Sequence, residues 1–301
     1  MNPIEFPGLG LTFHVQRVAL ELFGKSIYWY GIIIACGFLL AAIFCSRQAH
    51  QFGIKRDQLL DMLLFALPIG IICARIYYVI FNLQLYFNEE GAFVWKDAIA
   101  VWDGGIAIYG GIIGGALTCL IFCSVRKIPF LAMADLAVFG LLIGQCIGRW
   151  GNFVNQEAFG GPCTLPWRMG LNLNGQYMTV HPTFLYESLW NVVGFCLLFF
   201  LIRKLRTFDG ELFLSYLLWY GMGRFWIEGL RTDSLYLFQT GIRVSQLVAL
   251  LSVAVAVALL IWNLVIVKHS PEQLWVNREK KLRREQRQEK IRRKIDHGDN
   301  H

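Results

Sequence analysis

Seven apolar stretches separated by polar connections dominate the chain. They cover residues 28–44, 59–81, 106–123, 131–147, 183–202, 212–227 and 244–267. Each is close to the length of about 18–20 residues with which a helix crosses the hydrocarbon core of a bilayer. Backbone groups in that core must be hydrogen-bonded within the chain, which a helix achieves by itself. The pattern therefore predicts an all-α polytopic membrane protein with seven transmembrane helices.

The polar connections alternate in charge. Those over residues 45–58, 124–130 and 203–210 are basic, as is the tail, whereas the others are acidic or mixed. Because lysine and arginine stay on the cytoplasmic side of a membrane, we expect the N-terminus outside and the C-terminus in the cytoplasm. The expected parts are an irregular or strand-like arm at the outer face (1–27), a seven-helix membrane domain (28–267) and a basic cytoplasmic tail (268–301).

Composition excludes an ordinary soluble protein. Of the 301 residues 56% are hydrophobic and 16% charged, and the mean hydropathy is +0.48, whereas soluble domains are about 25% charged. Seven of the eight cysteines lie in apolar stretches without metal-binding spacing, so we expect buried thiols and no metal site. The net charge of +7 is concentrated in the tail, which we expect to be a solvated helix attracted to anionic membrane lipids, not to nucleic acid.

Four polar side chains gather where the fourth apolar stretch ends. Residues 148–157 read GRWGNFVNQE and bring together Arg149, Asn152, Asn155 and Glu157. Ionisable groups at a bilayer boundary are costly, and this favours a functional site. On a helix, Arg149 and Asn152 would share a face. The alternative is an interfacial helix end whose arginine extends its head group to water.

A second polar group follows in the sixth stretch. Arg224, Glu228 and Arg231 have the spacing of one continuous stripe on a helix. Glu228 can neutralise one of the two arginines, and this leaves the other free for an anion from elsewhere. Planar guanidinium groups suit phosphate well. The alternative is a purely structural salt-bridge cluster between the fourth and sixth spans.

Weaker candidates are Tyr30, Arg75, Tyr109 and His181, each a single polar group in or beside an apolar stretch. A histidine before a helix is commonly a cap or loop residue, and a tyrosine at this depth is commonly an interfacial aromatic. The chain has no phosphate-binding glycine loop of the nucleotide type and no HExxH or GxSxG motif. Arginines, carboxylates, a tyrosine and a histidine at the outer face suit a reaction on a lipid phosphate without nucleotide or metal.

The stretch GRWGNFVNQE closely resembles the signature GRxGNFxNxE of the prolipoprotein diacylglyceryl transferases. Supporting motifs occur in the same order, and the resemblance covers about residues 25–265. They are Tyr30-Gly31, the segments 74–78, 101–105 and 181–187, the stripe from Arg224 to Arg231, and Ser245-Gln246.

The resemblance implies a reaction and a set of partners. The family moves the diacylglyceryl group of phosphatidylglycerol onto the thiol of the lipobox cysteine in a prolipoprotein signal peptide, and glycerol phosphate leaves. It implies a bacterial plasma or inner membrane enzyme without a cofactor, surrounded by membrane lipids and active toward the outer leaflet. Catalytic roles are then expected for Arg149, Arg224, Glu228, Arg231 and Tyr109. Substrate contacts are expected at Arg149, Asn152, Asn155, Glu157, Tyr30, Arg75 and His181.

The chain departs from the family pattern at two positions. Tyr109 stands where many members have a histidine that has been proposed as the base, and a phenol with a reference pKa near ~10 is a weaker candidate. Tyr109 would then act as a hydrogen-bond donor, or the base is Glu157, Glu228 or solvent. Phe184 replaces a common glutamine, which we treat as minor. Rival interpretations are a transporter with an anion site and a structural membrane scaffold.

Overall fold

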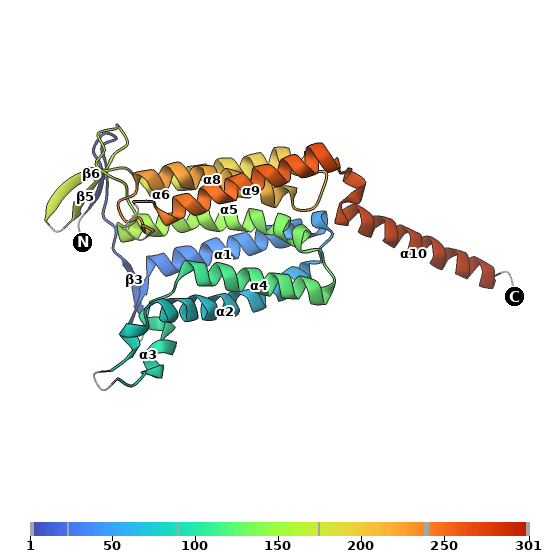
Figure 1. Ribbon diagram of the computed structural model, residues 1–301, viewed down its shortest axis with the longest axis horizontal. Coiled ribbons are helices and arrows are strands. Elements are labelled where there is room, and N and C mark those ends of the chain that lie inside the picture. The colour runs from blue at the N-terminus through green and yellow to red at the C-terminus, as the bar shows by residue number, and fades with distance from the viewer. Residues whose placement is uncertain (1–2, 23, 89–90, 174, 238–240, 299–301) are drawn as a thin grey trace. The chain divides into compact units, whose positions relative to one another are not determined.

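The structure is a computed structural model that describes residues 3–22, 24–88, 91–173, 175–237 and 241–298 (Figure 1). The chain divides into two compact units, one formed by Met1–Cys45 with Ala134–His301 and the other by Ser46–Met133. In the described residues, six helices are long and apolar enough to cross a membrane. They are Trp29–Phe52, Arg56–Phe81, Ile108–Arg126, Phe130–Asn155, Thr183–Leu205 and Val244–Val267.

The first unit contains most of the helices, and Figure 1 shows α6, α8 and α9 running side by side in it. Two of its helices, α1 (Trp29–Gln48) and α5 (Phe130–Asn155), each have one end in the other unit. The α-helices that lie wholly within the first unit are α6 (Thr183–Cys196), α7 (Arg203–Leu205), α8 (Glu211–Leu230), α9 (Val244–Ile261) and α10 (Trp275–Gly298). Shorter helical segments between them are the π-helices η4 (Leu197–Ile202) and η5 (Trp262–Val267) and the 3-10 helix η6 (Pro271–Gln273).

One predicted boundary changes, and one predicted span is helical but less apolar than the others. The expected polar loop from Arg149 begins later, because α5 continues to Asn155 and carries most of the signature on its last two turns. The sixth apolar stretch is helical as predicted, since α8 spans 20 residues, or about 30 Å. It is not among the six apolar candidates, and it carries Glu211, Arg224 and Glu228. The mainly helical, membrane-spanning character is confirmed, and the count of seven spans stays a prediction.

A small antiparallel sheet in the first unit joins the N-terminal arm to the connection after α5. Its order is β2-β1-β5-β6, formed by Leu11–Phe13, Ile4–Phe6, Met169–Leu173 and Gln176–Val180. Buried apolar side chains of the sheet pack on Phe153 and Phe184 from α5 and α6. A hairpin of β3 (Val18–Leu22) and β4 (Lys25–Tyr28) follows the sheet strands of the arm. The strand-like arm is confirmed, whereas the expectation of an all-α chain is wrong for these segments.

The second unit is built on two long helices, α2 (Arg56–Phe81) and α4 (Ile108–Arg126). Gly114 of α4 lies so close to α2 that a Cβ there would be 2.6 Å from the Cβ of Cys73, and Gly110 lies similarly close to the backbone of Cys73. Glycines at these positions thus permit the close packing of α4 on α2. Short elements complete the unit: η1 (Ala49–Phe52), η2 (Leu83–Tyr86), α3 (Trp95–Ile99) and η3 (Val101–Asp103).

Candidate active site

A buried carboxylate in the first turns of α6 joins three helices of the first unit. Glu187 is 4% exposed. Its Oε2 lies 2.5 Å from Nη2 of Arg149 on α5, and its Oε1 accepts a hydrogen bond of 2.8 Å from Nη1 of Arg224 on α8. A buried charge is costly unless it is paired and hydrogen-bonded, so the two guanidinium groups make this position possible for Glu187. The predicted convergence of Arg149 and Arg224 is confirmed.

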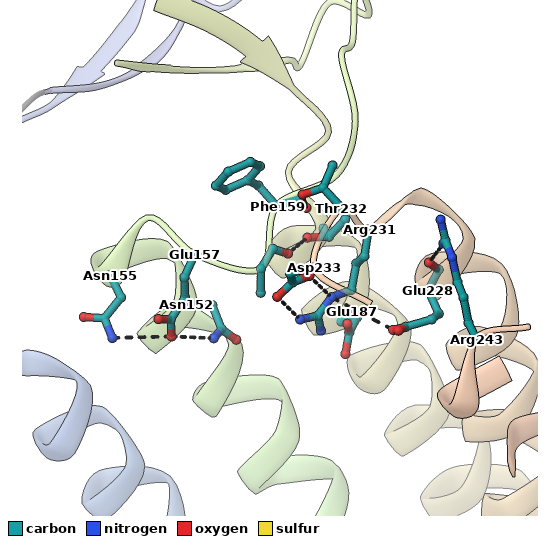
Figure 2. A network of polar contacts seen from close by, with 12 residues as sticks. Asn152, Asn155, Glu157, Phe159, Glu187, Glu228, Arg231, Thr232, Asp233 and Arg243 are labelled. Atoms are coloured by element: carbon teal, nitrogen blue, oxygen red, sulfur yellow. Dashed lines mark hydrogen bonds and ion pairs between the residues drawn. The ribbon is translucent and has the colours of Figure 1, made fainter. Parts of the chain in front are cut away.

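A second buried carboxylate, Glu228, lies on α8 one turn after Arg224. Its Oε2 is 2.5 Å from Nη2 of Arg224, as the i,i+4 spacing predicts, and 4.0 Å from Nε of Arg231. Arg243, which directly precedes α9, donates from its guanidinium to the backbone carbonyl oxygen of Glu228 (Figure 2). Arg224 is therefore held between two carboxylates from different helices.

Arg231 differs from the expected helical stripe. Helix α8 ends at Leu230, and Arg231 has an extended backbone at the C-cap position. Its Nε and Nη2 donate to the two carboxylate oxygens of Asp233 at 2.9 and 2.7 Å, a bidentate pair that Figure 2 shows beside Glu228. These hydrogen bonds lower the pKa of Asp233 below its ordinary value, although partial burial opposes the shift. Asp233 therefore stays ionised, and Arg231 stays fixed, well into acidic solution.

Arg149, Arg224 and Arg231 each have a carboxylate partner, so the expectation that one of the two arginines of α8 is left for an outside anion is wrong. Three cations (Arg149, Arg224, Arg231) face three anions (Glu187, Glu228, Asp233). A guanidinium group carries five N–H donors, and each carboxylate contact uses only one or two of them. The carboxylates thus fix the guanidinium planes while further donors stay available for a ligand anion.

The asparagines of the signature extend the network along the end of α5. Arg149 Nη1 donates to Oδ1 of Asn152 at 3.3 Å, and Nδ2 of Asn152 donates to Oε1 of Glu157 at 2.9 Å. Asn155 reaches the same oxygen at 3.4 Å (Figure 2). The ring of Tyr30 lies against this turn, because a Cβ on its neighbour Gly151 would be 2.7 Å from a ring carbon. The end of α5 thus brings together five of the predicted site residues, and Arg149 connects them through Glu187 to Arg224.

His181 lies just before α6, where Gly160 and Gly161 link it by backbone hydrogen bonds to the end of α8. The backbone of Gly160 donates to the carbonyl of His181 at 3.0 Å, and the backbone of His181 donates to Gly161 at 3.1 Å. Gly161 in turn donates to the carbonyl of Leu230 at 2.9 Å. The imidazole Nδ1 is 3.2 Å from the hydroxyl of Tyr186. The contacts of His181 are those of a residue that holds the two helix ends together, and its predicted contact with substrate stays a prediction.

Arg75 and Tyr109 belong to the second unit. The Arg75 side chain is buried, and its three nitrogens donate to four backbone carbonyls of the connection between α2 and α4, those of Asp97, Ala98, Gly104 and Gly105, at 2.5–2.9 Å. The ring of Tyr109 lies 6.5 Å from that of Tyr77. These contacts support a structural role for Arg75 within its unit. The predicted roles of both residues toward substrate stay predictions.

Replacing Arg75 with lysine is expected to lower the free energy of unfolding by about 2–3 kcal/mol, since hydrogen bonds to charged groups contribute about that much. A lysine keeps the charge but cannot donate in four directions from a planar fork. The matched control is Arg126→Lys, because Arg126 forms an exposed pair of 3.0 Å with Asp61 in the same unit. Exposed pairs contribute at most about 1 kcal/mol. Denaturant unfolding in detergent measures both, and equal losses would contradict the structural role of Arg75.

Glu187 and Asp233 were not predicted as site residues, and neither was Arg243, which contacts Glu228. The sequence shows Glu187 one turn inside an apolar stretch, a costly position that signals a buried cationic partner, but it does not show which one. Asp233 follows Arg231 by two residues in a polar connection, where its pairing depends on the local turn and gives no periodic signal.

Known proteins with similar sequences match most of the chain but not its C-terminal end. Residues 17–262 match the family described as prolipoprotein diacylglyceryl transferase. A phosphatidylglycerol–prolipoprotein diacylglyceryl transferase of Oceanobacillus iheyensis is 46% identical over 259 residues, which are 83% of this chain and 88% of the relative. Proteins of the same name from Lysinibacillus sphaericus and Clostridioides difficile are 43% and 45% identical, covering 88% and 79% of this chain and 98% and 92% of their own lengths.

Proposed function

The chain belongs to the prolipoprotein diacylglyceryl transferase family, and from this premise we propose that it transfers the diacylglyceryl group of phosphatidylglycerol to a prolipoprotein. The acceptor is the thiol of the lipobox cysteine in the signal peptide. Its sulfur attacks the glyceryl C3 carbon, a thioether forms, the C3–O bond breaks and glycerol phosphate leaves. The observation that carries the proposal is the Arg149–Glu187–Arg224 bridge, which lies within the matched residues.

The arginines suit the charge that develops in this reaction. Breaking the C3–O bond leaves negative charge on the departing phosphate, and donors that are already fixed in place stabilise such charge most effectively. Glu187 and Glu228 hold Arg224 from two sides, and Glu187 also holds Arg149. We propose that these two arginines bind the phosphate and that Arg224 is nearest the bond that breaks.

The headgroup and the thiol proton require other groups. We propose that Asn152, Asn155 and Glu157 orient the headgroup glycerol, since amides and a carboxylate satisfy hydroxyl groups well. Of the two carboxylates that could accept the thiol proton, Glu228 is paired with Arg224, whereas the contacts described for Glu157 are with amide N–H groups. Glu157 is therefore the better acceptor.

We propose a bacterial plasma or inner membrane location with the site at the outer leaflet. In this arrangement α8 joins the six apolar helices to make seven spans, the N-terminus is outside and the C-terminus is in the cytoplasm. The alternation of basic connections supports the orientation. Both reactants are embedded in the membrane, so the lipid and the signal peptide must reach the site laterally.

The test is release of glycerol phosphate by purified protein from phosphatidylglycerol and a lipobox peptide. We expect release that requires the peptide cysteine, with a matching gain of the diacylglyceryl mass on the peptide. Arg149→Ala is expected to reduce both. If the folded wild-type protein released none, the transferase proposal would fail. Binding of phosphatidylglycerol without turnover would then favour an anion-binding transporter.

The tail has two parts with different expected roles. Leu274 and Val276 are buried, and the backbone N–H of Trp275 donates to Asp209 at 2.8 Å, which anchors the start of α10 to the turn before α8. The rest of α10 is strongly basic, and we propose that it is attracted to anionic lipid at the cytoplasmic surface.

Truncation after Arg278 is expected to leave turnover in detergent unchanged and to weaken binding to anionic vesicles. Truncation after Lys268 also removes Leu274 and Val276, and should lower the free energy of unfolding by about 3–6 kcal/mol, because each buried aliphatic side chain contributes about 1.5–3. Thermal unfolding and vesicle sedimentation measure the two effects. Loss of turnover on truncation after Arg278 would show that the basic part of α10 takes part in catalysis or folding.

A further inference from the structure

Helices α6 and α8 are joined by a symmetrical contact of two tryptophans and two glycines, which we call the Trp–Gly clasp. Trp190 and Gly194 on α6 have the same spacing as Trp219 and Gly223 on α8. The two indole rings stack with centroids 4.3 Å apart and planes 17° apart. Each indole Nε1 donates to the backbone carbonyl of the other tryptophan, at 2.9 Å from Trp190 and 3.0 Å from Trp219. Two chemically equivalent halves therefore hold the helices together.

Each glycine makes room for the indole of the opposite helix. A Cβ on Gly223 would overlap Nε1 of Trp190 and lie 2.7 Å from its Cε2. A Cβ on Gly194 would overlap Nε1 of Trp219 in the same way and lie 3.2 Å from its Cε2. The carbonyls that accept the indole protons keep a second lone pair for their own helix. The clasp thus fixes both the distance between α6 and α8 and their position along each other.

One half of the clasp consists of Trp190 and Gly223, and the other of Trp219 and Gly194. Only the first half lies beside the ion pairs. Trp190 follows Glu187 by one helical turn, Gly223 directly precedes Arg224, and all four line one small notch. Trp219 is five residues before Arg224, and Gly194 is seven after Glu187, distances of about 7–10 Å along the helix axes. The other half is therefore a built-in control, with the same chemistry at a greater distance from the site.

We propose that Trp190 and Gly223 are positioning residues for the transfer, acting through Glu187 and Arg224. They set the register at which Glu187 Oε1 meets Arg224 Nη1 at 2.8 Å, and so the direction of the remaining Arg224 donors. A local displacement of about 1 Å at Gly223 is enough to break this hydrogen bond, whereas the other half of the clasp lies too far along the helices to act on it directly. The inference rests on the proposed role of Arg224 at the phosphate.

The test compares Gly223→Ala with Gly194→Ala in the full-length protein. Each adds one methyl group against an indole, so we expect similar losses in the midpoint of thermal unfolding. Gly223→Ala is expected to lower kcat by about tenfold to a hundredfold and to raise KM for phosphatidylglycerol, since displacements of about 1 Å have such effects. KM for the lipobox peptide should not change. Gly194→Ala should keep kcat within about threefold of wild type, a change of less than 1 kcal/mol in the barrier.

Equal kcat values in the two alanine variants, reduced or not, would overturn the proposal and leave the clasp a packing contact only. If Gly223→Ala does not fold, Trp190→Phe and Trp219→Phe replace the pair, because each removes one indole donor and keeps an aromatic ring. Trp190→Phe should then show the larger loss of kcat. Affinity for phosphatidylglycerol in detergent is measured on all variants. Wild type without turnover would count against the transferase, whereas equal lipid affinity in Gly223→Ala and Gly194→Ala would count against the clasp.

Discussion

Replacing Arg224 with lysine is expected to lower kcat for diacylglyceryl transfer by about 10²–10³, the usual effect of losing one preorganised donor at a developing anion. The arginine holds Glu187 and Glu228 with different nitrogens, at 2.8 and 2.5 Å, and still has donors for the phosphate. A lysine ammonium is a single point of charge and cannot serve two carboxylates and a phosphate in one plane. Glycerol phosphate release by the purified variant, at saturating lipid and peptide, measures the effect.

Arg168→Lys is the matched control, because Arg168 is a half-buried arginine in the same unit that donates to the backbone carbonyls of Thr164 and Leu165. It should leave kcat close to wild type. If Arg224→Lys kept kcat within a few-fold of that control, Arg224 would act only as a positive charge. The proposed contact with the leaving phosphate would then be wrong.

Sequence periodicity predicts the helical elements well because it is a local property. The expected stretch 244–267 coincides with α9 and η5, and the expected stretch 59–81 lies within α2. Even α8, whose charges lower its apolar character, was predicted as a helix from its apolar pattern. Each of these segments satisfies its backbone hydrogen bonds by itself, so its neighbours in sequence are sufficient to predict it.

The sheet could not be predicted in the same way. Glu5 of β1 pairs with Gly170 of β5, a partner 165 residues away, and the strands of this sheet are only three to five residues long. Such pairing depends on where α5 and α6 bring the chain, not on local pattern. The partners in the ion pairs are equally hard to predict from the sequence when they lie on different helices. The i,i+4 pair of Arg224 and Glu228 was visible in the spacing, whereas the bridge from Glu187 to Arg149 requires the packing of α5 on α6.

The pairing of Glu187 with both arginines, which the sequence did not predict, also changes the chemistry that we infer. An arginine without a carboxylate would bind any anion strongly, with or without substrate. In the structure, Glu187 shares its two oxygens between Arg149 and Arg224, and Glu228 and Asp233 add carboxylates beside Arg224 and Arg231. A phosphate that enters adds charge to a balanced site and must be bound through directed donors. This favours a ligand of defined shape over a free anion and agrees with selection of one lipid headgroup.

Replacing Glu187 with glutamine is expected to lower the free energy of unfolding by about 3–5 kcal/mol, the usual cost of removing one partner from a buried ion pair. The glutamine fills the same space but leaves Arg149 without the carboxylate 2.5 Å away and Arg224 with Glu228 alone. Turnover should fall as well, because both guanidinium groups lose the group that orients them. Denaturant unfolding and glycerol phosphate release measure the two losses on the same preparation.

Glu157→Gln separates stability from catalysis, because Glu157 accepts hydrogen bonds from amides at an exposed position. It should reduce turnover with a loss of stability below about 1 kcal/mol, as expected for an exposed polar contact.

Added glycerol phosphate should raise the unfolding midpoint of Glu187→Gln more than that of wild type, because the ligand replaces the missing negative charge and stabilises by mass action. If Glu187→Gln were as stable as wild type and unaffected by glycerol phosphate, the carboxylate would not hold the two arginines. The phosphate site would then have to be sought elsewhere on the chain.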